Sequence, residues 1–562
     1  MNLAFDLKRV VKGDVSTAVA DLELASHDAS IFEVVPEVVV APKSVEDIEK
    51  LVKYVNGQKA DPSTGSGRLS LTARSAGTDM SGGPLSESII LDFLKYFVGI
   101  RNIDEAKQEA TVLPGTYYRD FEKATLEKGL LMPSYPASKG LCTVGGIVAN
   151  NSGGEKSLTY GKTEEYVKEL KVVLADGKEY TTRALNKPEL EAKMGQNDFE
   201  GKIYRDLWKL IETNRDLLKR AKPKVHKNSA GYYLWNVWDG KTFDINKLIT
   251  GSQGTLGLVT EITFKLVRPK THSTLLVLFL HDLKALAQVV ENVLKHKPES
   301  FESYDDHTMK LAVRFMPDML KTLGAKNLFS LGWKFWPELK MILTGGVPKL
   351  ILVAEFTGDS EEEIYQKAKD AEKDLEAHQL RTHIQKKDDH ITRSDAEEDK
   401  YWTIRRESFA LLRKHVHGKH TAPFIDDIIV RPEKLNEFLP ALNAVTKEFD
   451  ITYTIAGHIG DGNFHIIPLM DFNRPDFKQI ISGLSKKVYE LVIKNEGSIT
   501  GEHNDGLIRT PYLEQMYGRE VVELFQKTKA IFDPQNIFNP GKKTDATLAY
   551  GFEHIRHWPK GA

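Results

Sequence analysis

The sequence contains a single cysteine, Cys142, among 562 residues. One thiol cannot form an intramolecular disulfide, and a cluster bound by cysteines alone needs four, so this chain excludes both features. Long apolar runs are also missing, because no stretch reaches the roughly 18 apolar residues of a membrane-spanning helix. The opening MNLAFDLKRVVKGDV lacks the apolar core and cleavage site of a secretory signal. We therefore expect a cytoplasmic protein.

An excess of charge of one sign is absent as well. The chain has 77 Lys and Arg against 79 Asp and Glu, a formal net charge of −2. Without a basic field, we expect no nucleic-acid partner. Hydrophobic residues make up 41% and charged residues 28%, which is ordinary for a globular protein. The length exceeds that of one hydrophobic core, so we expect two or three domains.

Three zones follow one another along the chain and are our predicted domains: residues 32–269, 270–503 and 504–562. The first alternates β-branched segments with helical patterns, the second begins with an apolar strand, and the third is helical. The expected strands are 32–40, 69–73, 88–92, 170–175, 258–266, 273–280, 350–356 and 424–430, and the expected helices are 45–55, 118–128, 283–296 and 360–378. This pattern predicts an α+β fold with α/β layers, in which the second zone is an open sheet covered on one side.

Small residues and glycines gather in three segments: 74–83 (RSAGTDMSGG), 136–154 (PASKGLCTVGGIVANNSGG) and 251–257 (GSQGTLG). Glycine lets a ligand approach the backbone closely, and successive N–H groups in such turns form a site suited to a pyrophosphate. None of the segments has the pattern and context of a Rossmann or Walker loop. Taken alone, the first segment fits a plain surface turn equally well.

Together and in this order, the segments resemble the FAD-binding family of vanillyl-alcohol oxidase and p-cresol methylhydroxylase. Within that family they are most similar to the branch of D-lactate, glycolate and D-2-hydroxyglutarate dehydrogenases. The resemblance covers about residues 32–543 and implies a two-subdomain FAD-binding fold of the p-cresol methylhydroxylase (PCMH) type. It also implies an α/β cap domain over the flavin and a helical C-terminal segment that returns to the FAD.

The resemblance implies FAD contacts in all three segments and near the C-terminus, where Asn539-Pro540-Gly541-Lys542 matches. These contacts are Arg74, Ser75, Ala76, Gly77, Thr78, Asp79, Met80, Ser81, Pro136, Ser138, Thr143, Gly145, Gly146, Asn150, Asn151, Ser152, Gly153, Thr255, Gly257 and Asn539. Gln253 stands where the family often has Glu.

Two histidines flank a turn signal in residues 455–465 (IAGHIGDGNFH). On a helix, His458 and His465 would lie about 10 Å apart along the axis, too far to share one metal, and on a single strand farther still. The GDGN sequence lies between two apolar runs, so a hairpin-like reversal would bring both imidazoles to the same end. Hydrogen-bonded histidines without a metal are the alternative.

Downstream, Glu502 lies beside His503 in residues 497–506 (GSITGEHNDG). Two histidines and one glutamate suit Zn²⁺ or Mn²⁺, with positions left open for substrate. The family resemblance implies that His458, His465 and Glu502 are the metal ligands and that His503 is the base near the flavin. Glu502 and His503 can both serve one site only if the backbone turns there, which the neighbouring glycines permit.

Several other positions bear on the substrate. Trp402-Thr403-Ile404-Arg405 resembles a family motif whose arginine binds the substrate carboxylate, so we expect Arg405 to do so. Ile467 stands where D-2-hydroxyglutarate enzymes carry Asn, and Ile425 stands where some relatives have Lys. Asn504-Asp505, after the Glu-His pair, is a further departure from the commoner pattern. The residues at 467 and 425 favour a D-lactate-like monocarboxylate.

The predicted function is therefore the FAD-dependent, metal-assisted oxidation of a D-2-hydroxy acid to the 2-oxo acid, with hydride transfer to flavin N5. The alternatives are a D-2-hydroxyglutarate or glycolate dehydrogenase subunit, an enzyme similar to alkyl-glycerone-phosphate synthase, and a flavin-binding subunit without a metal. Because one cysteine cannot hold a cluster, the electron acceptor would be a quinone, an electron-transfer flavoprotein, a separate iron–sulfur subunit or oxygen.

Aromatic residues and lysines are concentrated in residues 325–347 (AKNLFSLGWKFWPELKMILTGGV). Interfacial membrane segments have this composition, so peripheral contact with the inner face of a membrane is one interpretation. A cap-domain hairpin or the contact of a homodimer is the other, and we favour it.

Overall fold

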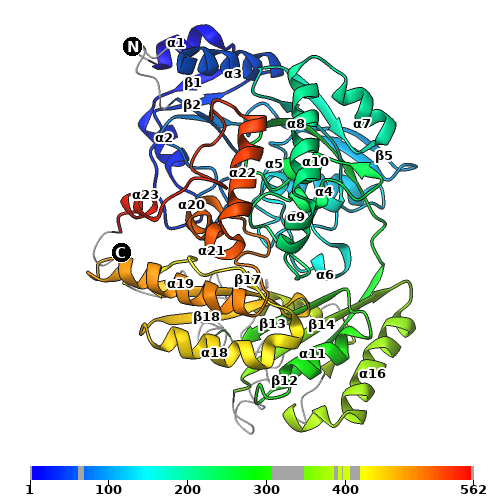
Figure 1. Ribbon diagram of the computed structural model, residues 1–562. Helices are drawn as coiled ribbons and strands as arrows, with labels where there is room; N and C mark the ends of the chain where they lie inside the picture. The colour runs from blue at the N-terminus through cyan, green and yellow to red at the C-terminus, as the bar shows by residue number, and fades with distance from the viewer. Residues whose placement is uncertain are drawn as a thin grey trace.

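The computed structural model describes residues 3–60, 69–306, 308, 347–384, 390–394, 397–405 and 418–558 (Figure 1). All but the last residue of the aromatic segment 325–347 lies outside the described residues, so membrane contact there stays a prediction. Within the described part of the chain, none of the helices combines the length and the apolar character needed to cross a bilayer.

The first zone contains two main sheets. The first sheet has the order β1-β2-β4-β3, with β2, β3 and β4 parallel. Its strands are β1 (Asp14–Ser16), β2 (Val38–Ala41), β3 (Leu71–Arg74) and β4 (Ile89–Asp92). The second sheet is antiparallel, in the order β5-β6-β11-β7-β8. Its strands are β5 (Ile100–Asp104), β6 (Glu109–Val112), β7 (Val167–Val173), β8 (Glu179–Arg183) and β11 (Leu258–Lys265).

Helix packing in this zone follows apolar periodicity. In α3 (Val45–Ala60), Ile48, Leu51, Val52 and Val55 recur at helical spacing and are fully buried in the core beside the first sheet. Further helices complete this part of the molecule: α1 (Leu3–Val10), α2 (Val19–Ser26), α4 (Tyr118–Leu126), α5 (Val144–Asn150), α7 (Lys187–Met194), α8 (Phe199–Thr213), α9 (Arg215–Ala221) and α10 (Asn246–Ile249).

The second zone is built on one sheet, in which eight strands can be described. Its main path is β15-β12-β14-β13-β18-β19-β16, and β17 pairs with β19. The strands are β12 (His272–Leu280), β13 (Ser300–Asp305), β14 (Leu350–Gly358), β15 (His390–Ile391), β16 (His420–Thr421), β17 (Ile428–Ile429), β18 (Thr452–His458) and β19 (Asn463–Met470). Four helices pack in a row beside it: α16 (Glu361–Ala377), α11 (Leu286–Leu294), α18 (Leu435–Lys447) and α19 (Phe477–Lys494).

The third zone leaves this cap sheet and returns to the first zone, where α22 (Arg519–Phe532) packs against α8 and α9 (Figure 1). Two backbone hydrogen bonds then join the chain to β3: Leu71 N–H donates to Ile537 O, and Asn539 N–H donates to Leu71 O. The shorter helices of this zone are α20 (Gly506–Arg509), α21 (Leu513–Tyr517) and α23 (Leu548–Glu553). The mixed fold and the returning helical segment agree with the sequence prediction.

Two predicted strands are shorter than expected. Of residues 32–40, only β2 from Val38 is regular strand, because Pro36 has no N–H to donate to a ladder. Of residues 424–430, only Ile428–Ile429 pair, because Asp427 has a φ of +66°, outside the extended region. This second irregularity lies in the candidate active site.

Candidate active site

A cavity of about 840 Å³ is lined by the three glycine-rich segments together with residues of the cap sheet. The cavity wall includes most of the predicted FAD contacts: Arg74, Ser75, Ala76, Gly77, Thr78, Asp79, Met80, Pro136, Ser138, Gly145, Gly146, Asn150, Ser152, Gly153 and Gly257. It also includes Arg405, His458, His465, Glu502 and His503. Segments distant in the sequence therefore meet around one space large enough for a cofactor and a small substrate.

Five predicted FAD contacts are not among the lining residues: Ser81, Thr143, Asn151, Thr255 and Asn539. Their side chains bind other parts of the loops. Thr143 caps α5 by accepting a hydrogen bond from Gly146 N–H, and Asn539 donates to the carbonyls of Gly83 and Gln253 at 2.9 and 2.7 Å. They therefore support the cavity wall from behind.

The predicted hairpin is present, and it explains why the two histidines meet. β18 pairs with β19 so that His458 lies opposite Asn463 and His465 opposite Ala456. Residues 456 and 458 share one face of β18, so both imidazoles are on the same face of the ladder, with ring centroids 5.2 Å apart. Gly462, with a φ of +71°, closes the reversal.

Gly462 provides a test of the hairpin. A Cβ at this position would overlap the carbonyl oxygen of Val430, in addition to the strain of positive φ. We expect Gly462→Ala to lower the free energy of unfolding by more than about 1 kcal/mol. Gly518→Ala is the matched control, because its φ is +78° and nothing lies within 4 Å of the added Cβ. Thermal unfolding should show the larger loss for Gly462→Ala, and equal losses would contradict the packing argument.

Three donor atoms converge at one point on the cavity wall. His458 Nε2 lies 2.9 Å from Glu502 Oε1, His465 Nε2 lies 3.2 Å from the same oxygen, and the two Nε2 atoms are 3.3 Å apart. In this arrangement two imidazole nitrogens face each other beside a carboxylate oxygen. It is the arrangement expected when all three atoms coordinate one cation. This donor set fits a borderline divalent metal such as Zn²⁺ or Mn²⁺.

A second possible ligand set shares two of these residues. Asp427, His465, Glu502 and His503 also offer atoms within 4.8 Å of one another. Both oxygens of Asp427 already accept hydrogen bonds, however, which leaves them poorly placed to bind a metal. Oδ2 accepts from Glu502 N–H, His503 N–H and Thr500 Oγ1, and Oδ1 accepts from Asn463 Nδ2. His458 has no such competing demand on Nε2, so we favour the set that contains it.

The same contacts of Asp427 explain how Glu502 and His503 serve one site. Asp427 Oδ2 accepts hydrogen bonds from the backbone N–H groups of Glu502 and His503, at 2.8 and 2.7 Å. Because two consecutive N–H groups point at one oxygen, the chain bends there. Asn504 follows with a φ of +70°, a left-handed conformation that Asn adopts more readily than most residues. The predicted backbone turn is thus present.

The electrostatics of the site keep Glu502 ionised. Burial by itself would raise the pKa of Glu502, but the charges of Lys227 and His458 and hydrogen bonds from both histidines hold that pKa well below its ordinary value. The fully buried Lys227 Nζ lies 3.6 Å from Glu502 Oε2 and 3.1 Å from Asp461 Oδ2. A buried carboxylate that stays charged beside two imidazoles is suited to binding a cation.

The environment of His465 favours a proton on this side chain. Burial lowers the pKa of His465, but hydrogen bonds to Asp426 and Glu502 and their charges raise it to about 10. A metal binds neutral imidazole, so metal binding here would release that proton.

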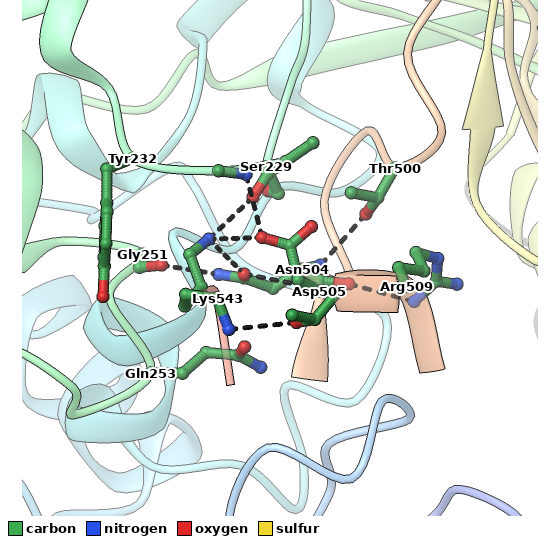
Figure 2. Close-up of polar contacts among 12 residues, drawn as sticks. Ser229, Tyr232, Gly251, Gln253, Thr500, Asn504, Asp505, Arg509 and Lys543 are labelled. Atoms are coloured by element: carbon green, nitrogen blue, oxygen red, sulfur yellow. Dashed lines mark hydrogen bonds and ion pairs between the residues drawn. The ribbon is translucent and has the colours of Figure 1, made fainter. Parts of the chain in front are cut away.

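Figure 2 shows the network of polar contacts around Asn504, the residue that follows His503 in the chain. The side chain of Asn504 donates to the carbonyls of Asn150 and Gly251, at 3.1 and 2.9 Å, and accepts from Lys543 Nζ at 2.7 Å. Lys543 also pairs with Asp505 at 2.8 Å, and both are fully buried. The turn is therefore fixed to two of the glycine-rich segments and to the C-terminal segment.

Several residues of the site were not predicted from the sequence: Glu302, Asp426, Asp427 and Lys227. Adjacent acidic residues after an apolar run, at 426–427, were the one available local signal. Arg405, which was predicted, lines the cavity and makes an ion pair with Glu302 Oε2 at 3.0 Å. Ile467 and Ala456 also line the cavity, whereas Ile425 is fully buried in the core.

Comparisons with known families agree with this architecture. Residues 36–183 match the family described as FAD binding domain, and residues 269–543 match the family described as FAD linked oxidases, C-terminal domain. Together these matches cover most of the chain and support FAD as its cofactor.

Curated relatives extend over nearly all of the chain. The glycolate oxidase subunit GlcD of Bacillus subtilis is 29% identical over 92% of this chain and 91% of its own length. The D-lactate dehydrogenase of Anaerostipes hadrus is 28% identical, over 95% and 94%. The D-2-hydroxyglutarate dehydrogenase of Pseudomonas putida is 25% identical over 94% of this chain. The chain spans about half the length of this relative and of several others with the same name.

Solved structures share the fold. p-Cresol methylhydroxylase with substrate bound gives a TM-score of 0.66 at 15% identity, covering 97% of this chain and 96% of the other. Alkyldihydroxyacetonephosphate synthase gives a TM-score of 0.60 at 14% identity, covering 94% and 82%. At such low identity the likeness concerns the fold alone. With both domain families matched in order and this fold shared, the chain belongs to the family of FAD-linked oxidases, with an FAD-binding domain of the PCMH type followed by the C-terminal domain of that family.

Proposed function

We propose that this protein oxidises a D-2-hydroxy acid to the 2-oxo acid and is assisted by a divalent metal. The observation that carries the proposal is the convergence of His458, His465 and Glu502, with His503 beside them, on the wall of the cavity that the glycine-rich segments line. Relatives named as D-lactate, glycolate and D-2-hydroxyglutarate enzymes support the substrate class.

Each residue has a distinct task. When bound, FAD would supply the hydride acceptor and the metal would polarise the substrate hydroxyl. His458, His465 and Glu502 would hold the metal, and Arg405 would bind the substrate carboxylate through its guanidinium. His503 would take the hydroxyl proton as general base. Its Nδ1 lies 2.9 Å from Asp426 Oδ2, so Nε2 is the nitrogen left to accept that proton.

The substrate side chain is expected to be small or apolar. Ile467 and Ala456 line the cavity next to the histidines and offer no charge to a second carboxylate. We therefore propose that monocarboxylates such as D-lactate are preferred over D-2-hydroxyglutarate. Electrons would then pass to an external acceptor, which we propose to be a quinone, an electron-transfer flavoprotein or a separate iron–sulfur subunit.

A substrate screen tests the proposal. Under anaerobic conditions, D-lactate should reduce the bound flavin and L-lactate should not, with glycolate and D-2-hydroxyglutarate measured in parallel and an artificial dye as acceptor. Reduction by the L-isomer alone would refute the stereochemical part. A much higher specificity constant for D-2-hydroxyglutarate would refute only the preference for monocarboxylates. Protein that binds FAD but no metal would instead favour the alkyl-glycerone-phosphate-synthase-like or flavin-subunit alternatives.

A further inference from the structure

Two buried carboxylates, Glu302 and Asp426, stand behind the predicted metal ligands. Glu302 Oε1 lies 2.5 Å from His458 Nδ1, and Asp426 Oδ1 lies 3.2 Å from His465 Nδ1. In both cases the imidazole uses Nδ1 for the carboxylate, which leaves Nε2 for the point where the donor atoms converge. A carboxylate in this position fixes the tautomer and the orientation of a metal-binding histidine.

Each carboxylate also contacts a second group of the active site with its other oxygen. Glu302 Oε2 accepts from Arg405 Nε at 3.0 Å, and Asp426 Oδ2 lies 2.9 Å from His503 Nδ1. The second contact has the distance of an ion pair without the alignment of a hydrogen bond, since neither atom has a well-aligned partner among the described residues. One oxygen therefore faces the metal site and the other faces a group that handles the substrate.

The scaffold holds both carboxylates firmly. Glu302 lies in β13 of the cap sheet and is 1% exposed, and Asp426 is fully buried. The backbone carbonyl of Asp426 accepts a 2.7 Å hydrogen bond from the fully buried Arg509, which also donates to the carbonyl of Asn504. Asp426 is thus tied to the same buried network as the turn that carries His503.

We propose that Glu302 and Asp426 are bridging positioning residues: Glu302 couples the metal ligand His458 to Arg405, and Asp426 couples the metal ligand His465 to His503. The proposal rests on the proposed function and adds a division of labour to it. Glu302 links metal binding to binding of the substrate carboxylate, whereas Asp426 links metal binding to proton removal.

Isosteric amides separate these roles, because both neighbours of each carboxylate are donors. A carboxylate presents a charged oxygen to each neighbour, but an amide has one accepting oxygen and one NH₂ group. Glu302→Gln and Asp426→Asn would each turn one of two contacts into a donor facing a donor. The shape of the side chain is kept, so loss of volume does not complicate the result.

The first measurement is metal affinity, made on FAD-loaded protein from which metal has been removed. The protein and a coloured chelator then compete for added Zn²⁺ or Mn²⁺. Both variants should bind metal 10- to 100-fold more weakly than wild type, the usual effect of losing a residue behind a ligand. Glu200→Gln is the matched control: Glu200, on α8, is 4% exposed and pairs with Lys193 of α7 at 2.7 Å. It should bind metal as wild type does.

The second measurement is anaerobic flavin reduction with metal at saturation. Glu302→Gln should raise the substrate concentration for half-maximal rate at least about tenfold, because Arg405 loses its orientation. Asp426→Asn should lower the limiting rate at least about tenfold with little change in that concentration. Should Glu302→Gln not fold, Glu302→Asp, which keeps the charge but is too short for both contacts, should show the same pattern.

Metal affinities of both variants within twofold of wild type would overturn this inference while leaving the proposed function intact. The same holds if both variants change the same kinetic parameter, because the split between the two carboxylates would then be absent. A wild-type protein that binds neither metal would overturn this inference together with the metal-assisted function.

Discussion

Replacing His503 with alanine should slow the reduction of the flavin by substrate by roughly 10²- to 10⁴-fold, the usual contribution of a positioned general base. The His503 side chain lies on the cavity wall beside the metal ligands, and its ring stacks on His465 with centroids 4.9 Å apart. It supplies none of the three favoured metal ligand atoms. We therefore expect His503→Ala to retain both FAD and metal, so that the loss is confined to the reductive half-reaction.

Stopped-flow reduction at saturating substrate measures this effect, with FAD and metal content determined on the same preparation. His296→Ala is the matched control, because His296 is not among the residues that line the cavity and its ring contacts Asp374 at 3.0 Å instead. It should reduce at nearly the wild-type rate. A wild-type rate for His503→Ala would mean that another group removes the proton.

Removing any one metal ligand should have the second large effect. We expect His458→Ala, His465→Ala and Glu502→Gln each to weaken metal binding by more than about 100-fold, beyond the 10- to 100-fold cost of losing a residue behind a ligand. The glycine-rich segments are unchanged in these variants, so FAD should remain bound. Substrate should then no longer reduce the flavin at a useful rate, whereas dithionite still should.

Elemental analysis and absorbance spectra of the same samples test this expectation. His281→Ala is a suitable control, since His281 lies outside the cavity and binds the carbonyl of Thr382. Treatment of wild type with a chelator should reproduce the ligand variants, and added Zn²⁺ or Mn²⁺ should restore the rate. If all three variants lost FAD as well, these residues would be structural parts of the fold rather than metal ligands.

The parts of the site that the sequence predicted are those with local causes. The reversal between His458 and His465 followed from the turn residues Gly460–Asn463 and from the apolar runs on either side, and the strands pair as expected. The bend at Glu502 and His503 was anticipated from nearby glycines. Its actual cause is the carboxylate of Asp427, 75 positions earlier than Glu502.

The parts that escaped prediction depend on contacts between distant segments. Glu302 binds His458 across 156 positions, and no periodicity or turn signal relates the two. Asp426 and Asp427 lie where residues 424–430 appeared to be a regular strand. A left-handed backbone at Asp427 interrupts that strand, and the cost is offset by the hydrogen bonds that its carboxylate makes to the turn at Glu502.

Gln253, which lines the cavity, joins loops of the first zone to residues of the third zone. Its Nε2 donates to Ser81 Oγ at 3.0 Å, its Oε1 accepts from Gly506 N–H at 2.9 Å, and its backbone carbonyl accepts from Asn539 Nδ2. Two of these partners lie 253 and 286 positions after Gln253, so they are synthesised well after it. Both sheets of the first zone could pair long before then, but the loops between them would lack their fixing contacts. We therefore expect flavin capture to be a late step, because a nascent chain that stops short of Gly506 would have the sheets of the cofactor domain without the contacts that fix the loops around the cofactor.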